Sequence, residues 1–431
     1  MSERYQKIYA VIFMIMLFGF AGYNIWMNWE NIVTEVRDGI DKNEIITDLT
    51  ENYDISSLEA SAQTVNTAVN NNFVGGHLWN EVYGAFNAAM WKNEENNFAY
   101  VRDKDGLEYY ANFWNQPNIT MKELAKRMKR MKDDLEPQGT KVILLLYPTR
   151  YDSEWADGYY GIPYQDYNEY ADEYLRYLRR YDVDYIDYRE IFENTGKRGD
   201  ELFYKTDHHW HSQAAFYAMT KLVDYIRYEY GDDLDPTGKY CDMNNYYQDT
   251  YKESFMGSMG RETGELYGGL DDFTLMTPKF ETSVRYSYYT SSGQTLGNEG
   301  SFTDTLILKR QFTRDDLYLR DLNNCYMSGV MLADEIENNL AENDTSVLMI
   351  RNSYSSPVAV FLTPMIKKMD LVWGINASER SIMERIENNH YDYVIVAINV
   401  DNFDNEENFT FYTEATEELG SEDEDSEVED E

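Results

Sequence analysis

Apolar positions in two stretches of the chain, residues 120–187 and 347–398, alternate between the helical period and short continuous runs. Thr120 and Glu123 have the spacing of a capping box that opens a helix, and the run over residues 141–147 is typical of a buried parallel strand. This alternation predicts an α/β sandwich with a parallel central sheet. Beyond those elements, we expect helices at 164–181, 357–368 and 379–388, and strands at 183–187, 347–350, 371–373 and 393–398.

Antiparallel pairs are predicted in two further places. Residues 98–110 place strand-like runs on both sides of an Asp-Lys-Asp-Gly turn, which is the pattern of a hairpin. Residues 235–340 are rich in Gly, Tyr, Ser and Thr, and they predict antiparallel β-hairpins inserted into the α/β domain. The alternating runs in this insertion are 274–277, 282–289 and 303–308. We therefore expect the α/β domain to span residues 76–400, with residues 30–75 as a polar, Asn-rich stalk before it.

The N-terminus carries a long apolar block. Residues 8–27 contain twenty positions without a charge, and at about 1.5 Å per residue they span a hydrocarbon core of roughly 30 Å. Arg4 and Lys7 precede the block and Glu30 follows it, which places the N-terminus in the cytoplasm and the rest of the chain outside by the positive-inside rule. A cleaved signal peptide is the alternative, but its apolar region is shorter and ends in small residues. Residues 1–29 are therefore predicted to form a cytoplasmic stub and a transmembrane anchor.

Negative charge is concentrated at the other end of the chain. The sequence has 38 Lys and Arg against 78 Asp and Glu, a formal net charge of −40, and residues 401–431 hold 15 acidic side chains with no Lys or Arg. This balance argues against a nucleic-acid partner and against binding to an anionic membrane through a basic patch, because both need clustered cations. Since residues 401–431 also lack periodicity, we expect an acidic disordered tail there.

Tyrosine is unusually frequent and cysteine is rare, with 39 Tyr and 2 Cys in the chain. Tyrosine covers apolar surface while keeping one polar end. Pairs such as residues 159–160, 246–247 and 288–289 therefore fit either a sugar-stacking surface or ordinary packing at strand edges. Cys241 and Cys325 allow one disulfide or two free thiols.

Three of the five histidines lie within the segment Thr206–His211, whose sequence is TDHHWH. In one interpretation, Asp207 orients the imidazole of His209, which acts as a general base near neutral pH. In a second, His208, His209 and His211 bind a metal, although metal sites on helices favour histidines four residues apart. In a third, the segment is only the polar start of the helix that follows it.

A serine that this base can activate lies far downstream. Ser353 follows the predicted strand 347–350 and precedes a predicted helix. Ligands of α/β sheets bind at the carboxyl ends of the strands, and the N–H groups at a helix N-terminus stabilise an oxyanion. Together with Asp207 and His209, this placement predicts a Ser/His/Asp site for acyl transfer. The G-x-S-x-G motif of many esterases is absent from the sequence.

Three blocks of the sequence together resemble a known family. They are TDHHWHSQAAFYA from Thr206, FMGSMGRETG over Phe255–Gly264, and VLMIRNSYSSPVAVFLTPMI around Ser353. They are similar to the DHHW proteins of Gram-positive bacteria, which look like relatives of the SGNH-hydrolase-like subunits of alginate O-acetyltransferases. The resemblance covers roughly residues 75–400, and as in that family the D-x-H pair precedes the serine. It implies an SGNH-hydrolase-like sandwich with Ser353 as nucleophile, His209 as general base and Asp207 as the residue that orients it.

The same resemblance implies acyl transfer outside the membrane. A membrane-bound O-acyltransferase would act as the acetyl donor, and Ser353 would pass the acetyl group to a hydroxyl of a cell-surface or secreted polysaccharide. No cofactor and no metal are expected. A carbohydrate esterase on the same fold and a non-catalytic glycan-binding or scaffold protein of the cell surface are the open alternatives.

The block around the serine departs from the family pattern in one residue. Asn352 stands where such blocks usually have an acidic or small residue, and it would either donate an N–H to an oxyanion or cap the following helix. The usual SGNH oxyanion blocks with Gly and Asn are not identifiable. We therefore expect the backbone N–H groups of Ser353 and Tyr354 to form the oxyanion hole, with His208 as a supporting residue.

Overall fold

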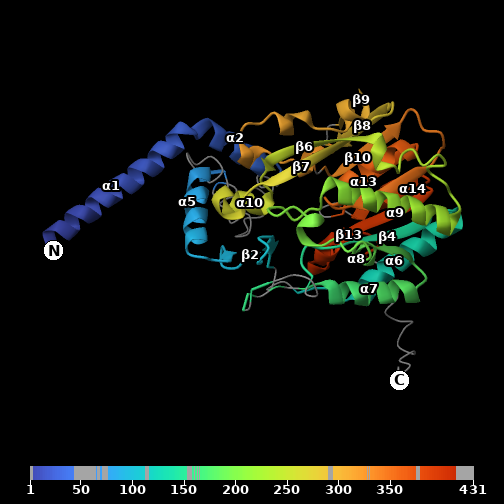
Figure 1. The fold of residues 1–431 in the computed structure, drawn as a ribbon, viewed down its shortest axis with the longest axis horizontal. Coiled ribbons are helices and arrows are strands. Elements are labelled where there is room, and N and C mark those ends of the chain that lie inside the picture. The colour runs from blue at the N-terminus through green and yellow to red at the C-terminus, as the bar shows by residue number, and fades with distance from the viewer. Residues whose placement is uncertain are drawn as a thin grey trace, which may run out of the picture. The chain divides into compact units, whose positions relative to one another are not determined.

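The computed structural model describes residues 3–42, 76–111, 116–152, 166–289, 295–327, 331–374 and 379–413, with single residues and pairs between them at 65, 68–69, 158–159, 161–162, 164 and 329. The chain forms two compact units, residues 1–83 and residues 84–431. The second unit contains the α/β domain, whose elements are labelled in Figure 1.

An eight-stranded sheet forms the centre of the second unit (Figure 1). Five parallel strands lie side by side, and three antiparallel strands continue the sheet at one edge. In spatial order the strands are β5 (Asp184–Asp187), β4 (Lys141–Tyr147), β13 (Tyr393–Asn399), β11 (Ser346–Arg351), β12 (Lys368–Trp373), β10 (Ala333–Asn338), β8 (Val284–Tyr289) and β9 (Thr295–Gly300). Strand β11 therefore lies inside the parallel part of the sheet.

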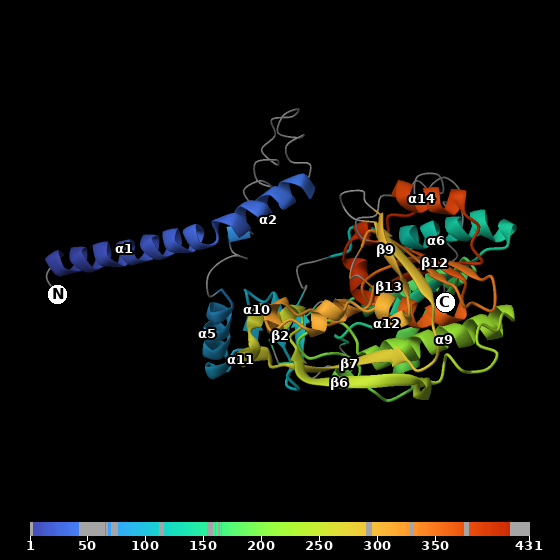
Figure 2. The ribbon, with the colours of Figure 1, turned by 90° about the horizontal axis from the view of Figure 1, so that it is seen from above.

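Helices cover both faces of the sheet because its parallel strands are apolar on both faces. Successive side chains of a strand point to opposite faces, and in β4 Leu145 belongs to one core cluster whereas Leu144 and Leu146 belong to the other. The first core contains α8 (Tyr188–Glu193), α9 (Ser212–Tyr230) and α13 (Ser355–Leu362), and the second contains α6 (Met121–Leu135), α7 (Asn168–Arg180) and α14 (Glu379–Asn388). Figure 2 shows α6 and α14 on one side of β12 and β13 and α9 on the other. The predicted α/β sandwich with a parallel central sheet is confirmed.

Smaller elements surround this core. A three-stranded antiparallel sheet contains the predicted hairpin, and a two-stranded sheet follows α9 in the chain. These elements are β1 (Glu94–Glu95), β2 (Tyr100–Arg102), β3 (Glu108–Tyr110), β6 (Tyr246–Phe255), α10 (Ser258–Thr263), α11 (Glu265–Gly268), β7 (Asp271–Pro278) and α12 (Phe302–Thr305). Helix α5 (Gly76–Ala89) contains the boundary between the two units.

Local sequence signals located several elements correctly. The Thr120 side chain accepts the N–H of Glu123 and the Glu123 carboxylate accepts the N–H of Thr120, so α6 begins with the predicted capping box. Helix α14 has the predicted bounds. Helix α13, however, ends at Leu362, because a short 3-10 turn containing Pro364 follows it and proline cannot continue a helix.

The insertion over residues 235–340 is only partly hairpins. Strands β8, β9 and β10 extend the central sheet, and β6 pairs with β7. The predicted strand at residues 303–308 is wrong, because α12 begins there. Ser301 caps this helix by accepting the N–H of Asp304 on its hydroxyl, which is the usual role of serine at a helix start. Cys241 and Cys325 are both free thiols.

Residues 401–413 belong to the folded core, and their assignment to a disordered tail is wrong. Phe403, Phe409 and Phe411 are buried in the core that contains α6 and α7. Burial of three aromatic side chains outweighs the acidic composition of the segment, since each such side chain contributes about 1.5–3 kcal/mol when removed from water. Residues 414–431 lie outside the described residues, so the tail stays a prediction for them.

The first unit contains α1 (Glu3–Met27) and α2 (Trp29–Lys42). Within the described part of the chain, no helix combines the length and the apolar character that a membrane span requires. The predicted transmembrane anchor is therefore not confirmed and stays a prediction. Most of the predicted stalk, residues 43–64 and 71–75, lies outside the described residues.

Candidate active site

Ser353 lies at the carboxyl end of β11, between that strand and α13. Both neighbours of β11 run parallel to it, so Ser353 stands at the edge where α/β sheets place their ligands. The end of β11 is held by an ion pair, because Arg351 lies 2.6 Å from the carboxylate of Asp334 and both side chains are fully buried. The serine is therefore presented by a rigid strand end.

Asp207 and His209 come from the loop that precedes α9. Backbone pairing between Phe203 and Trp210 closes this loop. The Trp210 side chain is buried, and its indole N–H donates to the carbonyl oxygen of Tyr354 at 3.2 Å. The loop is thereby tied directly to the segment that carries Ser353.

The structure brings the three predicted residues together in a row. His209 Nε2 lies 2.6 Å from Ser353 Oγ, although 144 positions separate them in sequence. His209 Nδ1 lies 2.5 Å from Asp207 Oδ1, which also accepts the backbone N–H of His209 at 2.9 Å. In this geometry the imidazole can accept the serine proton on Nε2 while the carboxylate holds the proton on Nδ1.

Asp207 is buried and remains an anion at pH 7. Burial by itself raises the pKa of a carboxyl group, but the neighbouring imidazoles of His209 and His208 outweigh burial and hold the pKa of Asp207 well below its usual range. Its second oxygen, Oδ2, accepts the backbone N–H of Ser258 at 2.7 Å. Both carboxylate oxygens are therefore fixed by the protein.

The FMGSMG block, to which sequence reasoning assigned no role, forms the start of α10 and supports Asp207. Gly257 lies so close to the DHHW loop that a Cβ atom on it would stand 2.3 Å from Asp207 Cβ and 2.3 Å from the Thr206 carbonyl oxygen. A Cβ on Gly260 would stand 2.8 Å from Thr206 Cβ. Only glycine permits this approach, which brings the N–H of Ser258 to the Asp207 carboxylate.

Arg150 is a second supporting residue that sequence reasoning missed. It follows β4, is 3% exposed, and donates to the carbonyl oxygens of Asp207 at 2.5 Å and Lys205 at 2.9 Å. Because a buried arginine requires acceptors in a defined geometry, it fixes the backbone of the loop. The sequence signal that could have indicated this role is the position of Arg150 just after a predicted parallel strand, at the edge of the sheet where ligands bind.

His208 packs against His209 and α10. Its ring lies 3.9 Å from the ring of His209, and its Nδ1 lies 3.0 Å from Ser258 Oγ. Its carbonyl oxygen accepts the hydroxyl of Tyr354. Burial, and then the neighbouring His209, lower the pKa of His208 to about 3, so its ring is neutral at pH 7. His208 thus links α10 to the loop and does not contact Ser353.

The amide of Asn352 is not available to an oxyanion, which corrects one of its two predicted roles. Its Nδ2 donates to the side-chain oxygens of Asn399 and Asn402, both at 2.9 Å. Two donated hydrogen bonds use both N–H groups of an amide. By contrast, the backbone N–H groups of Ser353 and Tyr354 donate to no protein acceptor within the described residues. These two groups precede α13 and are suited to bind an oxyanion.

A metal is the weaker interpretation of the same cluster. Ligand atoms of Asp207, His208 and His209 all lie within 4.8 Å of one another. The two nitrogens of His209, however, already face Asp207 and Ser353. His211 points elsewhere, with its ring 4.6 Å from that of Tyr204. The donor set therefore fits proton transfer better than metal binding.

Known proteins share part of the sequence and the fold of this chain. Residues 109–256 match the family described as the SGNH hydrolase-like domain of acetyltransferase AlgX. No curated protein matches the sequence of the chain. The structure of Bacillus cereus PatB1 with a sulfonyl adduct is 16% identical, with a TM-score of 0.54 over 72% of this chain and 97% of that chain. A second structure of PatB1 is 18% identical, with a TM-score of 0.52 over 70% of this chain and 96% of that chain.

A DHHW family protein from Eubacterium siraeum is also similar, with 18% identity and a TM-score of 0.49 over 74% of this chain and 94% of that chain. At these identities, the likeness to PatB1 shows a shared fold. Residues 109–256 are thus similar to the SGNH hydrolase-like domain of acetyltransferase AlgX, which agrees with the resemblance that the motifs of the chain carry.

Proposed function

We propose that the chain is an O-acyltransferase that carries an acetyl group on Ser353 and passes it to a hydroxyl of a polysaccharide. The observation that carries the proposal is the row Ser353–His209–Asp207, with contacts of 2.6 Å and 2.5 Å. The family match over residues 109–256 and the fold shared with PatB1 support acyl transfer as the reaction class.

In the first half of the reaction, Ser353 takes the acetyl group. His209 Nε2 accepts the proton of Ser353 Oγ as Oγ attacks the carbonyl carbon of the acetyl donor, and a tetrahedral oxyanion forms. The N–H groups of Ser353 and Tyr354 donate to that oxyanion. The bond to the leaving group breaks, His209 returns the proton to it, and an acetyl ester on Ser353 remains.

In the second half, an acceptor hydroxyl replaces the leaving group. His209 Nε2 accepts the proton of the sugar hydroxyl, whose oxygen attacks the acetyl carbon, and Ser353 Oγ leaves with that proton. Asp207, fixed by Ser258 and by His209, stabilises the imidazolium in both halves. Water in place of the sugar would give the esterase reaction, so the acceptor decides between the two activities.

The location outside the membrane is part of the proposal. Apolar side chains of α1 are exposed on several sides of the helix, and a membrane-bound O-acyltransferase as acetyl donor would require the domain to be held near the membrane. The most exposed of these side chains are Ile15, Phe18, Met16, Phe13 and Trp26. Fractionation of cells that express either the full chain or a chain lacking residues 1–29 tests whether the N-terminal segment attaches the protein to the membrane. Equal recovery of both forms in the soluble fraction would overturn membrane attachment.

The reaction is tested with the full chain and three variants. Ser353→Ala and His209→Ala should each lower transfer of acetyl from an aryl acetate to an oligosaccharide by about 10⁴-fold or more, whereas Ser287→Ala on β8 is the matched control. Intact mass should show an acetyl adduct on the wild type and none on Ser353→Ala. An aryl sulfonyl fluoride should label Ser353, with fluoride leaving as the Oγ–S bond forms. Undiminished transfer by Ser353→Ala would refute the proposal.

A further inference from the structure

An exposed aromatic side chain stands beside the histidines of the site. Tyr110, on β3, is 38% exposed, and its ring lies 5.7 Å from the ring of His208. The His208 ring in turn lies 3.9 Å from that of His209. Three consecutive contacts therefore connect the surface of Tyr110 with Ser353 Oγ.

A second tyrosine shares the face of Tyr110. Tyr100 on β2 is directly opposite Tyr110 in the antiparallel register, and the two ring centroids are 5.6 Å apart. Opposite residues of an antiparallel pair point to the same face, whereas the intervening Tyr109 points the other way. Tyr109 is 2% exposed and packs edge-on against Tyr151 and Tyr164. The hairpin thus keeps Tyr109 in the core, leaves Tyr110 exposed and leaves Tyr100 partly exposed beside it.

Hydrogen bonds hold this hairpin against the catalytic loop. The Tyr110 hydroxyl donates to Ser258 Oγ at 3.2 Å, the same atom that contacts His208 Nδ1. The backbone N–H of Glu108 donates to the carbonyl oxygen of Lys205, two residues before Asp207. Both contacts fix the position of the Tyr110 ring relative to His209, so that it can orient a ligand and not only adsorb it.

We propose that Tyr110 and Tyr100 form the acceptor subsite, where a pyranose ring stacks by its C–H face and presents a hydroxyl to His209. This inference rests on the proposed acyl transfer and names its acceptor class as a neutral, hydroxyl-rich sugar. Aromatic faces are apolar and electron-rich, which matches the C–H face of a sugar. Asp207, Arg261 and Glu262 act on the Tyr110 hydroxyl, and Glu262 and Glu108 act on that of Tyr100. Since acidic groups outnumber the one cation, the surroundings disfavour an anionic sugar and suit a neutral one.

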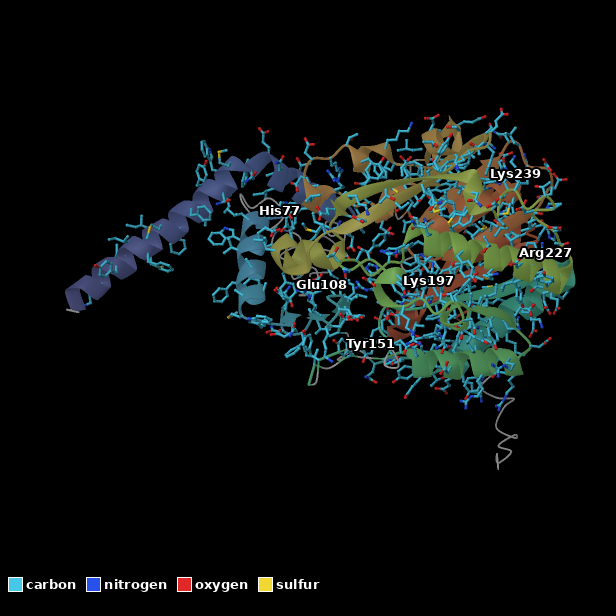
Figure 3. The ribbon with its side chains drawn as sticks, viewed as in Figure 1. His77, Glu108, Tyr151, Lys197, Arg227 and Lys239 are labelled. Carbon is cyan, nitrogen blue, oxygen red and sulfur yellow. The ribbon has the colours of Figure 1, made fainter. Side chains whose placement is uncertain are left out.

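A cavity elsewhere in the domain offers a rival acceptor site. It has a volume of about 150 Å³, and Thr149, Phe203, Arg189, Lys197 and Arg198 are among the residues that line it. Figure 3 shows Lys197 well apart from Glu108, the residue two positions before Tyr110. Its lining has three cations, with Lys197 and Arg198 exposed, against the two acidic residues Asp152 and Glu193, so this cavity would suit an anionic acceptor such as a uronate better than the tyrosine pair would. The two sites thus predict different acceptors and respond to different variants.

Binding to the full chain tests the subsite without relying on turnover. The probes are a panel of neutral tetrasaccharides of glucose, galactose, mannose and N-acetylglucosamine, with tetragalacturonate as the charged member, titrated by calorimetry into Ser353→Ala. Adding Tyr110→Leu should weaken binding of a neutral member about three- to ten-fold, as expected for one lost stacking contact. Tyr110→Phe should retain it, because the ring remains. Tyr247→Leu, which removes an exposed tyrosine of β6, is the matched control.

Transfer kinetics provide the second measurement. With Ser353 present, Tyr110→Leu should lower the ratio of transfer to hydrolysis of an aryl acetate about three- to ten-fold, through KM for the acceptor. Equal binding of the neutral sugars by Tyr110→Leu and its parent would overturn the subsite. So would a chain that prefers tetragalacturonate and loses this preference in the double variant Lys197→Gln/Arg198→Gln. Failure of the panel to bind would also overturn it. Absence of any acetyl adduct on Ser353 would instead refute the proposed acyl transfer, with binding still measuring the subsite.

Discussion

Replacing Gly257 by Ala is expected to slow catalysis through Asp207, which lies 50 positions earlier in the sequence. The added Cβ would lie 2.3 Å from Asp207 Cβ, against about 3.4 Å for an ordinary contact, so one of the two backbones must move by about 1 Å. Backbone strain plays no part, because φ of Gly257 is −70° and ψ is −179°. The movement would lengthen the 2.5 Å contact between Asp207 and His209 and the 2.7 Å bond from Ser258.

A misplacement of this size costs about 10²-fold in rate, which is roughly 2.7 kcal/mol at 1.36 kcal/mol per ten-fold. The assay is kcat/KM for aryl acetate hydrolysis, with Gly300→Ala as the control, since its Cβ would meet Thr305 Oγ1 at 3.4 Å. Asp207→Asn alone should cost about 10⁴-fold. If Gly257→Ala acts through Asp207, the double variant should be about as slow as Asp207→Asn. Additive losses, or a fully active Gly257→Ala, would refute the reasoning.

Two further predictions concern stability. Asn352→Ala should lower the free energy of unfolding by about 1–3 kcal/mol, because the oxygens of Asn399 and Asn402 each lose one of their two donors; unchanged urea unfolding would contradict this. Asp334→Asn should cost about 3–5 kcal/mol, because Arg351 would keep a buried charge without its counter-ion. Thermal unfolding measures it, with Asp133→Asn on the exposed surface of α6 as the control, and a loss equal to the control's would argue against the ion pair.

The fold was predictable where one local signal agreed with long-range packing. The capping box of α6 and the apolar run of β4 depend on neighbouring residues alone, and both elements form as expected. The alternating apolar pattern at residues 303–308 gave a wrong strand prediction. The hydroxyl of Ser301 caps a helix there, and the pattern of apolar positions carries no information about such a cap. Composition gave a wrong prediction at residues 401–413, where three buried aromatic side chains decide the structure although four acidic residues accompany them.

The reacting residues were easier to predict than their supports. Asp207, His209 and Ser353 are side chains with recognisable chemistry, and the structure places them in contact. The role of Gly257 depends on a backbone approach between segments 50 residues apart, which no spacing rule contains. Asn352 illustrates the same limit: its chemistry allowed an oxyanion contact, and only the positions of Asn399 and Asn402 show that its donors are already used.

Glu108 makes the stability of the domain depend on pH near neutrality. This buried carboxyl group accepts the hydroxyl of Thr263 at 2.9 Å on Oε1, while its buried Oε2 has no hydrogen-bond partner in the part of the chain that the structure describes. Burial raises its pKa from 4.5 to about 7, against the opposing effects of Thr263, Arg150 and Arg102, and Glu95 adds to the increase. The native state therefore keeps the proton to higher pH than the unfolded state.

The sign of the pH effect follows from the proton count. Between pH 4.5 and about 7 the native protein binds more protons at Glu108, so its stabilising contribution is full below pH 4.5 and is lost as pH rises through 7. The shift corresponds to roughly 3 kcal/mol. Glu108→Gln cannot ionise, and its stability relative to the wild type should rise by up to that amount between pH 4.5 and 8 in urea titrations. Glu229→Gln on α9, at an exposed position, is the control. If the free energy of unfolding of Glu108→Gln and of the wild type changes equally with pH, Glu108 is ionised in the folded domain over this whole pH range and the prediction is refuted.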